Sequence, residues 1–403
     1  MKKSYYEYYD TLYNEQSVIT FKSINLTQTV RLIAYLTFAM ILSIKINNKE
    51  KIKELIKVLG ITTFCAVIWG LIQFIMYYLG LEYPAFLFNN NPYAAQGYDQ
   101  MMYGIKRICS IATEPSVFAL NLVVFLPIII VYVLKESSKN TKKLSIAVIL
   151  TMVCTILTTS TTALVGVAII ISVLTIYLII KDKRERKNRL IKVLLYSAIS
   201  IVIAGVLCFG GNEIYNNKSL KSEIVATEEN TILENNTSNN KENVVSENTN
   251  MNIEDSLNIE KENENTEINN IENERKIDSF INALKQMTIE KLESGSGQER
   301  INREKLGFEI FLLSPILGVG WISFRTFTLF TNVLVNVGLI SIIYIFVVVI
   351  KQIIKNRKKD SDISLMFGLS ILGMLVAFAV SIPDLHYIYC WVILVLAYNY
   401  FKD

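Results

Sequence analysis

Long apolar runs separated by short polar segments dominate the pattern of this chain. A membrane-spanning helix needs roughly twenty mostly apolar residues. Segments of this kind cover residues 28–46, 54–79, 116–134, 144–160, 163–180, 190–210, 328–350, 363–381 and 386–401. The run from 144 to 180 is too long for one crossing, so we predict a break at TTSTT (158–162), where hydroxyl groups can satisfy the backbone of a tight turn. The pattern predicts an all-α polytopic integral membrane protein with about nine to eleven transmembrane helices.

The apolar segments form two groups on either side of a large polar loop. A polar N-terminal segment, 1–27, precedes transmembrane helices one to six, which we expect within 28–210. The loop covers 211–327, and helices seven to nine are expected within 328–403.

The large loop contains two parts of different character. Residues 221–274 are a low-complexity, acidic insert rich in Asn, Glu, Ser and Thr. Such a segment buries too little apolar surface to offset the entropy of ordering, so it is predicted to be disordered. Residues 276–327 are predicted to be helical and membrane-associated, because KIDSFINALKQMTIEKLE places its apolar residues at helical spacing. That helix either lies along the membrane surface or packs on the transmembrane bundle.

Composition and charge agree with a membrane protein. Hydrophobic residues make up 52% of the chain and charged residues 19%, whereas soluble domains carry about a quarter charged residues. Lys and Arg cluster in four short loops, KINNKEKIK, KESSKNTKK, KDKRERKNR and KQIIKNRKKD. Positively charged loops face the cytoplasm, so we expect the alternate loops and the N-terminus outside and the C-terminus inside. The basic clusters fit an anionic membrane surface rather than a nucleic-acid partner.

Four motifs share an order that resembles the O-antigen polymerase and ligase superfamily. They are RICSIATEPSVFA (107–119), the Ser/Thr-rich turn TTSTTALVG (158–166), SPILGVGWISF (314–324) and a helix that contains NVGLISIIYIF (336–346). The resemblance covers roughly residue 50 to the C-terminus, apart from the acidic insert. It implies a multi-pass protein of the cell membrane whose active face is external.

The resemblance also implies an activity and its partners. Members of this family transfer glycans carried on a polyprenyl diphosphate, and they need neither a metal nor another cofactor. The expected substrate is a polyprenyl-diphosphate-linked oligosaccharide, reached from within the lipid bilayer. Other membrane proteins of polysaccharide assembly are further candidate partners.

Cations for a diphosphate leaving group are present in the external segments. Arg suits this role because its planar guanidinium binds phosphate oxygens in a bidentate manner. The candidates predicted to lie outside and near the membrane plane are Arg107, Arg300, Arg303 and Arg325.

Two residues are candidates for accepting the proton of an acceptor hydroxyl. Glu114 lies directly before Pro115, at the start of an apolar helix. The alternative for Glu114 is structural, because a carboxylate there caps the first turn or orients Arg107. His386, the only histidine, lies two residues after Asp384, which would tune its pKa. The alternative for His386 is an amphipathic residue at the membrane boundary.

One departure from the family pattern favours a polymerase over a ligase. Ligases of the superfamily typically carry a histidine beside an asparagine late in the large loop. Here Thr331 precedes Asn332 at the matching place. We therefore expect a polymerase of surface polysaccharide, which transfers the lipid-linked glycan onto the next lipid-linked repeat unit. A ligase-like transferase that uses another acceptor remains the alternative.

Other classes of membrane protein fit less well. A flippase or transporter of lipid-linked sugars would carry more intramembrane charge and an internal repeat. A multi-helix lipid-sugar glycosyltransferase would carry paired carboxylates in its first external loop, which offers only Glu82 and Asp99. A membrane sensor would leave the external arginines unexplained.

Two further features of the sequence bear on the fold. Gly318 and Gly320 predict a sharp bend before Trp321. Arg31 is the one charge deep in an apolar helix, where it is costly, unless it extends from the end of a shorter first helix.

Overall fold

The fold is taken from a computed structural model of the chain. It describes residues 23–88, 100–102, 105–135, 141–181, 188–208, 210–211, 295–355, 361–382 and 384–402. The acidic insert 221–274 and the amphipathic stretch KIDSFINALKQMTIEKLE predicted within the large loop lie outside these residues.

All nine apolar segments found in the sequence are helical. The bundle consists of α2 (Ser23–Lys45), α3 (Lys49–Leu79), α5 (Pro115–Lys135), α6 (Thr141–Leu157), α7 (Thr161–Lys181), a helix Asn188–Cys208, α12 (Leu329–Lys355), α13 (Ser361–Val380) and α14 (Ile388–Lys402). Six described helices are long and apolar enough to cross a membrane. The prediction of an all-α polytopic membrane protein is confirmed.

Small elements at one end connect or cover these helices. They are the 3₁₀ helix η1 (Ala85–Leu87), the short antiparallel pair β1 (Met101–Met102) and β2 (Ile105–Lys106), and helix α11 (Gly295–Leu313) of the large loop.

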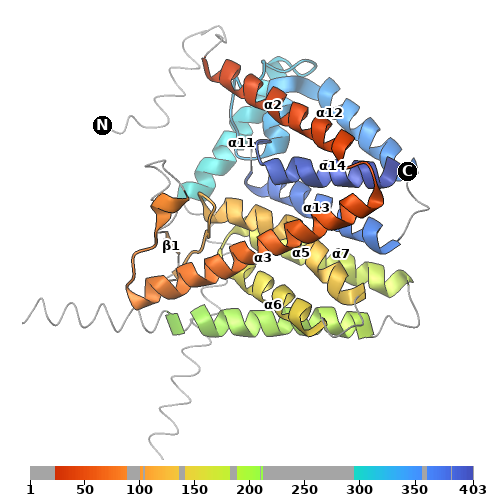
Figure 1. The fold of residues 1–403 in the computed structure, drawn as a ribbon. Helices are drawn as coiled ribbons and strands as arrows, with labels where there is room; N and C mark the ends of the chain where they lie inside the picture. Colours follow the sequence, from red (N-terminus) through yellow and green to blue (C-terminus); the bar gives the residue numbers. More distant parts are fainter. Residues whose placement is uncertain are drawn as a thin grey trace, which may run out of the picture.

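Helix α5 forms the centre of the bundle. It packs against α3, α6, α7 and α13, and 78% of its most apolar 18-residue stretch is buried. Helix α14 packs against α2 and α13, and α11 packs against α12. Figure 1 shows these long helices running side by side, with α11 beside α12. The core is therefore built around α5, a helix whose one charged residue is Lys135 at its last position.

Successive helices run back and forth, so the loops separate to two ends of the bundle. The C-terminal ends of α2, α5, α7 and α12 lie at one end, where Arg189 and Asp362 form an ion pair of 3.8 Å. The other end contains the start of α5, the α6–α7 turn and the loop between α13 and α14. There a hydrogen bond joins the hydroxyls of Thr162 and Ser381. The second end is called the site end below.

Local signals in the sequence set several helix ends. The Asn48 side chain accepts a hydrogen bond of 2.8 Å from the Lys51 amide and caps the start of α3. Gly80 ends α3 in the left-handed conformation. The predicted break within TTSTT is confirmed, because α6 ends at Leu157 and α7 begins at Thr161. The Thr158 hydroxyl donates to the Thr155 carbonyl in this turn.

Helix α12 is broken at Gly338, although the sequence predicts one continuous span there. Gly338 has φ 77° and ψ −180°, a conformation essentially restricted to glycine. The break frees two amides and two carbonyls about 14 Å from the start of the helix. At that depth unpaired backbone groups are costly, because lipid offers no hydrogen bonds.

The loop before α12 satisfies the freed backbone groups. The amides of Leu339 and Ile340 donate to the carbonyls of Pro315 (2.9 Å) and Ile316 (3.4 Å). In return the amides of Val319 (2.9 Å) and Gly320 (3.1 Å) donate to the carbonyls of Val335 and Asn336. Gly318 and Gly320 have φ 72° and 108°, which confirms the predicted bend. The loop 314–320 therefore replaces two hydrogen bonds of the helix.

We expect Gly338→Ala to destabilise the protein by at least about 2 kcal/mol, because it forces alanine into a glycine conformation. The new Cβ would also collide with the Ile316 carbonyl. Gly368→Ala in α13 is the matched control, since its Cβ meets no heavy atom within 4 Å. Thermal unfolding in detergent, followed by tryptophan fluorescence, measures both. Equal melting temperatures for the two variants would contradict the proposed role of the break.

Candidate active site

A cavity of about 380 Å³ opens at the site end of the bundle. Its walls come from α2, the start of α5, the loop before α12, the start of α12 and the loop between α13 and α14. The charged and polar residues that line it are Gln28, Arg31, Thr113, Glu114, Ser116, Arg325, Asn332, Ser381, Asp384, His386 and Tyr387. Three of the six predicted site residues, Glu114, Arg325 and His386, therefore meet at one cavity although they lie far apart in sequence.

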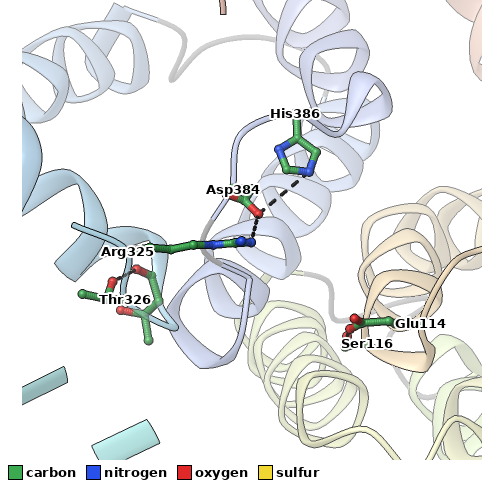
Figure 2. Close-up of polar contacts among 7 residues, drawn as sticks. Glu114, Ser116, Arg325, Thr326, Asp384 and His386 are labelled. Atoms are coloured by element: carbon green, nitrogen blue, oxygen red, sulfur yellow. Dashed lines mark hydrogen bonds and ion pairs between the residues drawn. The ribbon is translucent and has the colours of Figure 1, made fainter. Parts of the chain in front are cut away.

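Arg325, Asp384 and His386 form a connected group (Figure 2). The Arg325 guanidinium donates to the Asp384 carboxylate at 2.6 Å, and the same oxygen, Oδ2, lies 3.8 Å from His386 Nε2. Arg325 exposes 61% of its side chain and Asp384 exposes 16%. The carboxylate is thus held in place, while most of the guanidinium remains open to a ligand.

The imidazole of His386 is held in its neutral form. Burial lowers its pKa below the ordinary value of 6.5, Asp384 opposes the shift, and Arg31 and Arg325 add to it. A neutral imidazole can accept a proton near neutral pH. The environment therefore suits a general base.

Glu114 occupies the other side of the site, at the start of α5. Figure 2 shows Glu114 and Ser116 apart from the Arg325–Asp384–His386 group. The Glu114 carboxylate is exposed and accepts a hydrogen bond of 3.2 Å from the Ser116 hydroxyl. Its backbone carbonyl accepts from the amides of Val117 and Phe118. The backbone of Glu114 caps the helix, which leaves its carboxylate directed at the cavity.

Tyr387 lies near both carboxylates of the cavity. Burial raises the pKa of its phenol, and Asp384 and Glu114 raise it further. The phenol therefore stays protonated and can donate a hydrogen bond to a ligand. Sequence reasoning did not identify Tyr387, because an aromatic residue beside a membrane helix is ordinary.

Arg107 does not line the cavity, but it lies close enough to interact electrostatically with Glu114, which does. Its guanidinium donates to the Thr158 carbonyl (3.1 Å) and to the Gln100 side chain (2.7 Å). Burial lowers the pKa of Arg107, Glu114 opposes this shift, and Arg300 adds to it. An arginine remains charged at any physiological pH. Arg107 therefore binds the Ser/Thr turn through the Thr158 carbonyl and places a positive charge near Glu114.

Arg300 and Arg303 belong to α11 and also lie outside the lining of the cavity. Both guanidinium groups stack over the Phe327 ring, at 5.3 Å and 5.6 Å from its centroid. Arg303 Nε donates to the Arg325 carbonyl at 2.8 Å. These two arginines therefore hold the segment that carries Arg325.

Glu304 fixes the same segment and was missed by sequence reasoning. Its carboxylate accepts hydrogen bonds from the amides of Phe327 (2.7 Å) and Thr328 (2.8 Å) and from the Thr328 hydroxyl (3.1 Å). Thr328 directly precedes α12, so the carboxylate lies at a helix N-terminus, where negative charge is favourable. Nothing in the sequence distinguishes Glu304 from other acidic residues of the loop.

Arg31 and Asn332 are two further lining residues without a predicted role in the site. In the sequence Arg31 was notable only as a charge within an apolar helix. In the structure it lines the polar cavity, where a charged side chain is less costly than in lipid. Asn332 directly follows Thr331, which stands at the place where the family resemblance predicts a histidine in ligases. Among the described residues, no three His, Cys, Asp or Glu side chains converge to hold a metal ion.

The fold and the cavity define the class of protein: a polytopic membrane protein with a charged site at one end of its helical bundle. Residues 146–336 match the model of the O-antigen ligase family. This match supports the O-antigen polymerase and ligase superfamily, and the resemblance found in the sequence is confirmed. The family indicates an O-antigen ligase-like or polymerase-like function, carried out by a glycosyl-transferring enzyme of polysaccharide biosynthesis.

The matched range includes only part of the site. Arg300, Arg303 and Arg325 fall within it, whereas Arg107, Glu114 and His386 fall outside. No curated protein and no solved structure matches the chain.

We expect the single histidine to report the charges of the cavity directly. Asp384→Asn should lower the pKa of His386 further, because it removes the carboxylate that favours the imidazolium. Arg325→Gln should raise the pKa, because it removes a cation. Histidine-labelled protein in detergent gives one imidazole to follow by NMR titration. A value at or above 6.5 in the unmodified protein, or shifts of the same sign in both variants, would contradict this assignment, and Arg189→Gln at the opposite end should change nothing.

We expect Glu304→Ala to destabilise the segment 325–328 by about 1–2 kcal/mol, because three donors at the start of α12 lose their acceptor. Glu309→Ala, an exposed position on the same helix, is the matched control. Thermal unfolding measures the stability, and hydrogen exchange of the segment measures its opening. Similar exchange rates in both variants would show that Glu304 does not hold the segment.

Proposed function

We propose that this protein is a polymerase of surface polysaccharide at the outer face of the cell membrane. In this proposal it transfers a glycan from a polyprenyl diphosphate to a hydroxyl of the next lipid-linked repeat unit, with no metal ion and no cofactor. The observation that carries the proposal is the convergence of Glu114, Arg325 and His386 on one cavity. The basic loops at the opposite end support an external site end.

The reaction needs a bond exchange at one carbon. The acceptor oxygen bonds to the anomeric carbon of the donor glycan, and the bond from that carbon to the diphosphate oxygen breaks. The diphosphate leaves as an anion, and the acceptor proton passes to a base. Stabilising the leaving charge is the larger demand, because electrostatic stabilisation of developing charge is usually the largest single contribution to catalysis.

We assign the leaving group to the arginines. Arg325 is the direct candidate, since it lines the cavity and uses only one of its donors on Asp384. Arg107, Arg300 and Arg303 contribute positive charge around it, and Arg303 also holds the Arg325 backbone. They are proposed to bind the diphosphate once the glycan and lipid are in place.

Two residues can receive the proton, and both line the cavity. His386 is neutral, which is the form a base requires. Glu114 is exposed at the opposite wall and lies near Tyr387 and Arg107. We propose His386 as the base, because its imidazole is neutral, and Glu114 as its alternative, because it lies at the wall opposite to Arg325, from which the acceptor would approach in a direct displacement.

The second candidate function is that of a ligase, which moves the glycan to another acceptor. Its specific support is the match to the O-antigen ligase family. Asn332, beside the place of the missing histidine, lines the same cavity as His386. An imidazole is therefore available to the cavity from another loop, so both functions share the same proposed chemistry.

The test measures surface polysaccharide and lipid-linked intermediates in cells that lack the protein and carry a variant at normal membrane abundance. We expect His386→Gln and Arg325→Ala each to reduce long chains at least about a hundredfold, with accumulation of single repeat units on lipid. Arg189→Ala, which breaks an ion pair at the opposite end, should retain long chains.

Each other outcome contradicts a specific part of the proposal. Long chains that persist on the lipid carrier would indicate a ligase. Unchanged profiles in all variants would exclude this enzyme from the pathway. Loss in Glu114→Gln but not in His386→Gln would reassign the base.

A further inference from the structure

Helix α2 presents two different sides near the site end. Gln28, Arg31 and Tyr35 follow one another at helical spacing and line cavities. Leu26, Val30 and Ile33 each expose 57% of their surface, as expected for a lipid-facing side. The helix therefore separates a polar cavity from the bilayer.

Arg31 is the unusual member of the polar side. It makes no ion pair or hydrogen bond within the described residues, whereas Arg325 is bonded to Asp384. Arg31 lies about 12 Å from the first residue of α2. A guanidinium within a membrane helix usually faces a partner or a water-filled cavity, and Arg31 lines such a cavity without a counterion among the described residues.

Open space adjoins Arg31 on two sides. It lines the large cavity and also a smaller one of about 40 Å³ between α2, α12 and the α13–α14 loop. The two cavities share Asp384, His386 and Asn332 in addition to Arg31. The smaller cavity adds apolar and aromatic walls from Leu32, Tyr35 and Trp321. Arg31 thus lies where a polar space meets an apolar one.

The charges around Arg31 favour an anion. Asp384 is already engaged by Arg325, and His386 is neutral. Glu114 belongs to the opposite wall, beside Arg107. A phosphate between Arg31 and Arg325 would meet two guanidinium groups, each able to form bidentate hydrogen bonds.

We propose that Arg31 and Arg325 bind the phosphate of a lipid-linked substrate from two sides, and that its hydrocarbon chain leaves the site past the lipid-facing side of α2. This proposal rests on the proposed function and specifies the side from which that substrate enters. An amphiphile fits better than a soluble anion, because Val30 and Ile33, on the same helix as Arg31, expose apolar side chains as a lipid-facing side does. Arg31 is outside the range matched by the family model.

Binding can be tested without activity, because the chain has one histidine. The probe is farnesyl diphosphate, added to histidine-labelled full-length protein in nanodiscs and followed by the His386 NMR signal. An anion at Arg31 cancels a charge that lowers the pKa of His386, so binding should raise that pKa. We expect Arg31→Gln to weaken the apparent affinity at least tenfold, Arg31→Lys to restore part of it, and Arg189→Gln to leave it unchanged.

The remaining probes and outcomes decide the source of the anion. Inorganic diphosphate binding as tightly as farnesyl diphosphate would overturn the lipid-linked source. Farnesol binding equally would overturn the role of the phosphate. Equal affinity of Arg31→Gln and the unmodified protein would overturn the site, and thermal unfolding of Arg31→Gln checks that the variant is folded.

The polysaccharide profile separates this proposal from the proposed function. Arg31-dependent binding with a normal profile in His386→Gln and Arg325→Ala cells would retain the site and reject the polymerase. Loss of long chains in Arg325→Ala with unchanged probe binding in Arg31→Gln would retain the polymerase and reject the site.

Discussion

Satisfaction of backbone hydrogen bonds at the break in α12 is the constraint on which the site depends. A helix that opens at Gly338 inside a membrane must find new partners for its amides and carbonyls, and the loop 314–320 supplies them in reciprocal pairs. Asn336 extends the attachment, because its side chain accepts from the Phe324 amide (3.0 Å) and donates to the Phe324 carbonyl (2.6 Å). These hydrogen bonds hold the loop against α12. They therefore fix the position of Arg325, the next residue, which lines the cavity.

From that anchor the charges of the site are arranged in series. Glu304 holds the start of α12, Arg303 holds the Arg325 backbone, and Arg325 in turn holds Asp384 beside His386. Each link uses a charge that would otherwise be expensive near lipid. Both carboxylates in this series accept hydrogen bonds from specific donors, which offsets part of the cost of removing them from water. Helix α11, polar and peripheral, is therefore as important for the position of Arg325 as the transmembrane core.

The sequence was enough to predict the features that depend on local composition. It was not enough to predict those that depend on contacts between segments far apart in the chain. Hydropathy alone located the nine helices, and the Ser/Thr turn and the Gly318 and Gly320 bend follow from known backbone preferences. The break at Gly338 was missed, since a glycine inside an apolar run is common and only the docked loop explains it. Glu114, Arg325 and His386 were selected by residue type, but their meeting at one cavity depends on how α5, α12 and the α13–α14 loop pack. Arg31 was noticed only as a costly charge, because its neighbours come from the other end of the chain.

The location of the imidazole bears on what distinguishes the members of this superfamily. A proton acceptor is defined by its distance from the reacting hydroxyl and by its protonation state, not by the loop that carries it. In this chain Thr331 occupies the place expected for a histidine, and its neighbour Asn332 lines the same cavity as His386 from a different segment. Arg325 holds the Asp384 carboxylate, which places a negative charge beside that imidazole. Absence of the expected histidine from the large loop therefore does not remove an imidazole from the cavity, and we expect the choice between polymerase and ligase to rest on which acceptor the walls around α2 and α5 admit.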